Sequence, residues 1–231
     1  PLAMLFGGLV AAIFGVIIGI PALRLRGDYL AIVTLAFGEI IRSILNNLSF
    51  VGGSGGLNGI PRYSNYTVVY VMLVITVIVI TNLVNSRHGR AICSIRDNKI
   101  AAESMGIPVV YYKLLAFVVA AFFAGIAGVL YGHNLGILKP STFDFNKSIE
   151  ILVMVVMGGM GNIPGSVIAA LLITVLPEIL RGLQDYRMLI YAVVLIVMML
   201  LNNNAKFYNF KQKFFSKKAK QQGADLAKEG K

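Results

Sequence analysis

The sequence has few charged residues and a single cysteine. Only 13% of its 231 residues are charged, about half the share of an ordinary soluble domain. Cys93 has no second cysteine to pair with, which excludes an intrachain disulfide and a cysteine-based metal site. With 57% hydrophobic residues and a mean hydropathy of +0.78, the chain is expected to be a polytopic membrane protein.

Motifs that carry chemistry are also scarce. The sequence contains two glycine clusters, 52–61 and 158–165, but neither is followed by the Lys-Ser/Thr of a phosphate-binding loop. His88 and His133 are isolated and are expected at the surface rather than in a metal site. The sequence shows no paired carboxylates for catalysis either. We therefore expect a protein that is not an enzyme, with no nucleotide site, metal or cofactor of its own.

Long apolar segments predict the fold class, an all-α, polytopic transmembrane helical bundle with broken helices. A span needs roughly 20 apolar residues, so the chain has room for about six spans or more. The expected spans are residues 2–20, 28–48, 67–84, 114–132, 148–180 and 188–201, the fifth interrupted by the second glycine cluster. Because the chain opens with Pro1 rather than Met, we also expect one or more spans to precede it.

The net charge of +11 comes from basic clusters that lie outside the apolar segments, as in membrane proteins. Nucleic acid is therefore not an expected partner. Eight lysines lie in a tail at 204–231, and four more cations lie between Arg87 and Lys99. Short cytoplasmic segments concentrate Lys and Arg, so we expect the tail and the loop 85–113 to be cytoplasmic. The segment 148–180 must then cross the membrane twice, or dip in and return. Aromatic residues among the lysines of the tail favour an anionic membrane surface.

Glu39 and Arg42 lie within the second expected span. Glu39 is eleven residues after Asp28, or about 16 Å along a helix, and Arg42 follows on the same face. Charges inside a membrane are costly and usually face a cavity or a partner. Two interpretations stay open: a purely structural ion pair, or a polar translocation path lined by both residues.

The two glycine clusters are similar to each other. Glycine-broken spans in corresponding parts of a chain indicate discontinuous helices at a transport site. Under this interpretation the clusters belong to an inverted repeat, and Gly158, Gly159 and Gly161 lie on the translocation path. The alternative is that these glycines only ease helix packing and turns.

Small residues also mark the span 114–132. Gly125, Gly128 and Gly132 lie on nearby turns of one helix. Such a stripe lets another backbone approach closely, so we expect this face to pack against a second helix.

Residues 89–108 form a polar island between hydrophobic spans and must lie outside the bilayer. Asp97 or Asn98 can cap a short helix, and Gly106 followed by Pro108 can end it. A short helix outside the bilayer can form little hydrophobic core of its own, so we expect another protein to bind it. The residues expected at this contact are Arg96, Asp97, Lys99, Ile100, Ala101, Ala102, Glu103, Met105 and Gly106.

Four segments, 24–40, 89–107, 112–117 and 158–165, carry a family resemblance. Together they resemble permease subunits of bacterial branched-chain amino acid ABC importers, and most closely the longer of the two permeases usually paired. The resemblance implies a transmembrane permease domain over 1–203, in the bacterial inner membrane, followed by the cytoplasmic tail. It leaves open which branched-chain or related amino acid is carried.

The resemblance also implies partners: a second permease, two cytoplasmic ATP-binding subunits and a periplasmic protein that delivers leucine, isoleucine or valine. The polar island would correspond to the loop that docks on the ATPase. The family pattern Glu-Ala-Ala-x-x-x-Gly maps onto 100–106, with Ile100 in place of the leading Glu, so the residue that pairs with the ATPase stays open. The alternative function is a stand-alone, ion-coupled secondary amino acid transporter that uses Glu39 and Arg42.

Overall fold

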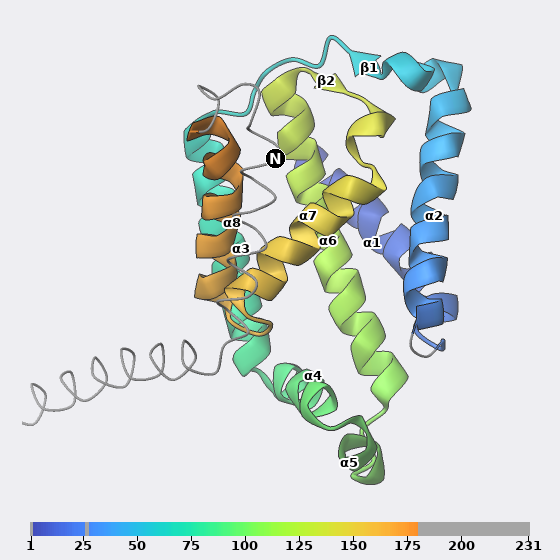
Figure 1. Cartoon of the computed structure of the whole chain (residues 1–231), viewed down its shortest axis with the longest axis vertical. Coiled ribbons are helices and arrows are strands. Elements are labelled where there is room, and N and C mark those ends of the chain that lie inside the picture. The colour runs from blue at the N-terminus through green and yellow to red at the C-terminus, as the bar shows by residue number, and fades with distance from the viewer. Residues whose placement is uncertain (1, 26–27, 180–231) are drawn as a thin grey trace, which may run out of the picture. The chain divides into compact units, whose positions relative to one another are not determined.

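The computed structural model describes residues 2–25 and 28–179, and these form helices with short connections (Figure 1). The all-α class is confirmed. The elements are α1 (Leu2–Ala22), α2 (Asp28–Asn47), η1 (Ser49–Val51), η2 (Gly53–Gly55), β1 (Leu57–Asn58), α3 (Tyr66–Asn85), α4 (Arg87–Asp97), α5 (Lys99–Ser104), α6 (Val109–Leu135), β2 (Ile137–Leu138), η3 (Pro140–Thr142), α7 (Phe145–Gly158) and α8 (Ile163–Ile179). They divide between two compact units, Pro1–Ile149 and Glu150–Lys231.

Four of the described helices, α1, α2, α3 and α6, are long and apolar enough to cross a membrane. Each matches one of the first four expected spans. The fourth begins earlier than expected, at Val109, directly after Pro108 at the N-cap. The chain is therefore a multi-pass membrane protein. The expected span 188–201 and the tail 204–231 lie outside the described residues.

The main packing contact of the first unit joins α1 to α6. A Cβ at Gly125 of α6 would lie 2.5 Å from the carbonyl oxygen of Gly7 and 2.6 Å from Cβ of Ala11. Glycine is therefore what allows the two backbones to approach this closely, as in other membrane helix pairs. Gly125 confirms the expected packing face, whereas a Cβ at Gly128 would meet nothing within 4 Å.

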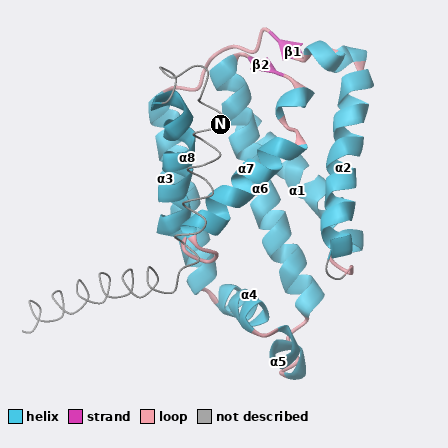
Figure 2. Cartoon of the chain, in the orientation of Figure 1, coloured by secondary structure: helices cyan, strands magenta, loops and turns pink. Residues whose placement is uncertain are grey.

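The glycine-rich connection after α2 folds back onto the end of α6. Strands β1 and β2 pair antiparallel, as Figure 2 shows, with Leu57 opposite Leu138. Nδ1 of His133 lies 2.8 Å from the carbonyl oxygen of Pro61, and the Ser64 hydroxyl donates to the Leu130 carbonyl at 3.3 Å. This cluster of glycines thus lies in a connection between helices rather than inside a span.

The second glycine cluster interrupts a helical segment, as expected. α7 ends at Gly158, and α8 begins at Ile163. Gly159 and Gly161 have φ of +90° and +86°, values that glycine adopts without steric cost. Asn162 then accepts a hydrogen bond from the backbone N–H of Gly165 at 3.4 Å, at the start of α8.

Candidate docking loop and polar cluster

The helix α4 contains the first part of the polar island and follows α3 after one connecting residue, Ser86 (Figure 1). The Ser86 hydroxyl accepts a hydrogen bond from the Gly89 backbone N–H at 3.1 Å, which caps the helix. Gly89 is buried, and a Cβ there would collide with the carbonyl oxygens of Leu83 and Val84. The turn from α3 into α4 therefore requires glycine at this position.

Asn98 separates α4 from α5, and it is both the C-cap of α4 and the N-cap of α5. Its backbone N–H donates to the Ser94 carbonyl at 3.0 Å, and its Oδ1 accepts from the Ala101 N–H at 3.1 Å. Of the two expected caps, the structure uses Asn98. Asp97 instead pairs with Arg96 at 2.9 Å. Its hydrogen bond and its charge raise the pKa of the Arg96 guanidinium, which stays protonated.

The helix α5 ends in a Schellman motif. Gly106, at φ +79°, donates to the Glu103 carbonyl at 3.0 Å, and Ile107 donates to the Ala102 carbonyl at 3.1 Å. These two bonds satisfy carbonyls that would otherwise lack partners at a helix end. The expected stop at Gly106, followed by Pro108, is confirmed.

The polar island has a small core of its own. Ile95 of α4, Ala102 of α5 and Val109 of α6 are 7%, 4% and 6% exposed and pack together, with Ile107 and Tyr112 against them. This cluster corrects the expectation that the region has little core to build. It also shows that Ala102 faces inward, so its small side chain allows α5 to approach α4 and α6.

Two large apolar residues of this segment are exposed, Ile100 within α5 and Met105 directly after its last residue. Ile100 and Met105 are 77% and 81% exposed, although the segment is too polar to lie in the bilayer. The other outward residues of the predicted contact are Arg96, Asp97, Lys99, Ala101, Glu103 and Gly106. Because α5 is capped at both ends, these side chains are presented by an ordered backbone.

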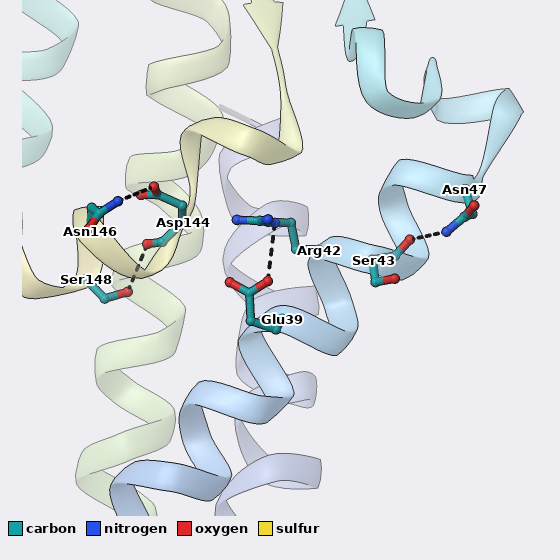
Figure 3. Close-up of polar contacts among 7 residues, drawn as sticks. All are labelled: Glu39, Arg42, Ser43, Asn47, Asp144, Asn146 and Ser148. Carbon is teal, nitrogen blue, oxygen red and sulfur yellow. Dashed lines mark hydrogen bonds and ion pairs between the residues drawn. The ribbon is translucent and has the colours of Figure 1, made fainter.

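The second candidate site is centred on Glu39 and Arg42 of α2. Arg42 Nε lies 3.4 Å from Glu39 Oε2, and the side chains are 34% and 53% exposed, respectively. The predicted contact between these residues is confirmed. Figure 3 shows the Arg42 guanidinium lying between Glu39 and Asp144, so one cation faces two carboxylates.

Asp144 is the residue of this cluster that sequence reasoning missed. Its carboxylate accepts from the Lys147 backbone N–H at 2.9 Å and from Asn146 Nδ2 at 3.0 Å, just before α7 begins. These hydrogen bonds, then the charge of Arg42, lower the pKa of Asp144. An Asp just before a helical segment is a capping signal, and Asp144 precedes the expected span 148–180 by four residues.

A cavity of about 230 Å³ lies beside this cluster. Glu39 and Asp144 supply carboxylates to its lining, Thr34 and Ser148 supply hydroxyls, and Leu35 is among its apolar residues. The cavity therefore combines polar groups with an apolar wall, which suits a small amphipathic solute.

The glycines predicted for the translocation path lie around the break between α7 and α8. A Cβ at Gly158 would collide with the backbone of Ser166, so this glycine lets the start of α8 pack closely on the end of α7. Gly159 and Gly161 supply the turn. Glu39 and Arg42 belong to the other compact unit, and a path shared by the two groups stays a prediction.

Comparison with known proteins identifies the family. The family described as "Branched-chain amino acid transport system / permease component" matches residues 1–201. The chain belongs to this family. It is 36% identical over 225 residues to the high-affinity branched-chain amino acid transport system permease protein LivM of Salmonella typhimurium, and equally to that of Escherichia coli. Each alignment covers 82% of this chain and 53% of the relative.

The chain thus spans about half the length of the curated relatives it matches. A shorter alignment links it to the high-affinity branched-chain amino acid transport system permease protein LivH of Salmonella typhimurium. That match is 34% identical over 90 residues and covers 39% of this chain and 29% of the relative. No solved structure matches the chain significantly.

Proposed function

We propose that this protein is the membrane-spanning permease subunit of an ABC importer and moves branched-chain amino acids across the bacterial inner membrane. Family membership and the similarity to LivM support this proposal. The partners would be a second permease, two cytoplasmic ATP-binding subunits and a periplasmic substrate-binding protein. The loop 85–113 and the tail would face the cytoplasm, in keeping with their positive charge.

The two exposed apolar residues at α5 are the observation that carries the proposal. Ile100 in α5 and Met105 directly after it are exposed on a segment that is fixed by the Asn98 cap and the Gly106 turn. Two such side chains favour burial in an apolar groove of a partner. Arg96, Lys99 and Glu103 would make polar contacts at the rim of that groove.

The translocation path would use Glu39 and Arg42, with Gly158, Gly159 and Gly161 at the broken helix. The cavity beside Glu39 supports this assignment because it offers both carboxylates and apolar surface. A branched-chain amino acid has an ammonium group and an apolar side chain, which these two kinds of surface could accept.

Reconstitution tests the proposal. The full-length protein is assembled with its candidate ATP-binding subunits, second permease and binding protein in proteoliposomes, and leucine uptake and ATP hydrolysis are measured. The double variant Ile100→Ser/Met105→Ser should lose the ATP-binding subunits on purification and lose ATP-driven uptake. Phe50→Ser, at a residue 81% exposed in the connection after α2, is the matched control and should retain them.

Two outcomes would contradict the proposal. If the double variant Ile100→Ser/Met105→Ser keeps coupled uptake at the level of Phe50→Ser, α5 is not the docking element. If the protein alone takes up leucine in response to an ion gradient and without ATP, the ion-coupled transporter is the correct function.

A further inference from the structure

A second cavity, of about 450 Å³, lies where α1 ends and α5 and α6 begin. It is separate from the cavity beside Glu39. Its charged lining residues are Arg24, Lys99, Glu103 and Lys113. They come from three parts of the chain: the turn after α1, the docking helix α5 and the first turns of α6.

The cations of this cavity have no carboxylate partner among the side chains that the structure describes. Ion pairs among the described residues join Glu39 to Arg42 and Arg96 to Asp97, and none of these four residues lines the cavity. Lys99 and Glu103 are one helical turn apart on α5, a spacing that permits a pair, yet they do not form one. Three cations therefore surround a cavity that contains one carboxylate, and the excess of positive charge favours an anion.

The remaining lining is apolar and lies close to the ends of membrane spans. Leu25 and Val110 line the cavity and are 40% and 47% exposed, and Leu30 of α2 contributes as well. The spans α1, α2 and α6 all end or begin here, so a bilayer crossed by these helices would have its boundary with water close to the cavity. Basic pockets between transmembrane helices at this depth suit lipid head groups.

We propose that this cavity binds a phosphate group of the kind carried by an anionic phospholipid. Arg24, Lys99 and Lys113 would donate hydrogen bonds to the phosphate oxygens, since several charged donors on one anion bind strongly. Leu25, Leu30 and Val110 would contact the lipid chains. Glu103 would accept from a hydroxyl of the head group, such as those of phosphatidylglycerol.

A phosphate bound here would connect α5 to the ends of the spans. Lys99 belongs to α5, Lys113 to α6, and Arg24 to the turn between α1 and α2. The described residues make no ion pair between these elements. The bound phosphate would link their cations instead, and so would hold α5 against the spans. The inference depends only on the cavity and its charges, whichever solute the protein transports.

Native mass spectrometry of the purified full-length protein tests this inference. The protein in neutral detergent is titrated with phosphatidylglycerol, with phosphatidylcholine and with inorganic phosphate, and the bound fraction is measured. The variant Arg24→Gln/Lys113→Gln should lose roughly 30-fold in affinity for phosphatidylglycerol. Each cation near an anionic membrane surface contributes roughly fivefold to binding, and the variant removes two. Arg24→Lys/Lys113→Arg, which keeps both charges, should restore binding.

The matched control is Arg87→Gln/Lys139→Gln, which removes the same charge from exposed positions outside the cavity. Selective binding of phosphatidylglycerol that only the cavity variant weakens supports a lipid. Binding of inorganic phosphate with the same dependence supports the phosphate site with a free ligand. Equal losses in both double variants, or no preference for phosphatidylglycerol or phosphate over phosphatidylcholine, would overturn the proposal.

Discussion

The backbone N–H of Ile107 donates to the carbonyl oxygen of Ala102 at 3.1 Å, across the turn that ends α5. Ala102 is also part of the small core of the polar island, and Ile107 packs against that core. This combination of a backbone bond and an apolar contact is characteristic of the Schellman motif. It depends on Gly106, which lies between them at φ +79°.

Replacing Gly106 should disturb α5 by a conformational effect alone. A Cβ there would meet no atom within 4 Å, but the left-handed backbone costs a β-branched residue about 1–2 kcal/mol. Gly106→Val should therefore speed hydrogen exchange in α5 and reduce transport-coupled ATP hydrolysis in the assembled complex. Gly106→Asn should be milder, since Asn tolerates this conformation. Equal effects of Val and Asn would contradict this explanation.

Removing the cap of α5 should loosen its first turn. Asn98→Ala deletes the hydrogen bond from the Ala101 N–H to Oδ1, a change that costs about 1 kcal/mol at typical caps. The amide of Ala101 should then exchange faster with solvent, as hydrogen–deuterium exchange would detect. Asn98→Asp, which can still accept the bond, is the control. Exchange that stays at the original rate in the Ala variant would show that the cap is dispensable.

The α1–α6 contact should be sensitive to added volume at one glycine and not at its neighbour. Gly125→Val would push a side chain into Gly7 and Ala11, and overpacking of this kind costs about 1–3 kcal/mol. Gly128→Val, at a site with open space in the described residues, should cost much less. Thermal unfolding in detergent would compare the two variants. Similar melting temperatures would argue against close packing at Gly125.

Asp144 should make the start of α7 sensitive to acid. Its hydrogen bonds from Lys147 and Asn146 lower its pKa below the ordinary value of 3.8. The stabilisation of the start of α7 by the Asp144 carboxylate is therefore fully present above pH 3.8. It is lost as the pH falls through the lower pKa that Asp144 has in the folded protein. Protection of the Lys147 amide should fall in this acidic range. Asp144→Asn, which can cap without titrating, should remove the pH dependence.

The helical spans could be predicted from the sequence because each is an apolar run of sufficient length. The start of α6 was placed late, at 114, because Tyr111, Tyr112 and Lys113 lower the local hydropathy. The two-helix form of the polar island was also missed. Its core joins Ile95, Ala102 and Val109 from three elements, and such a contact has no signature in local sequence.

The polar cluster was predicted in part. The spacing of Glu39 and Arg42 was enough to predict their contact, since residues three apart on a helix are neighbours. Asp144 is about one hundred residues further along the chain, and only the fold brings it near Arg42. Two of the three cations of the second cavity, Arg24 and Lys113, are likewise brought together by the packing of α1 against α6.

The connections of the polar island have a mechanical consequence. One residue, Ser86, joins α3 to α4, and one residue, Asn98, joins α4 to α5, while residues 105–108 join α5 to α6. Short joints make a stiff linkage, because few backbone torsions can absorb a displacement. A displacement of α5 would therefore reach two membrane spans at once, α3 through α4 and α6 through residues 105–108.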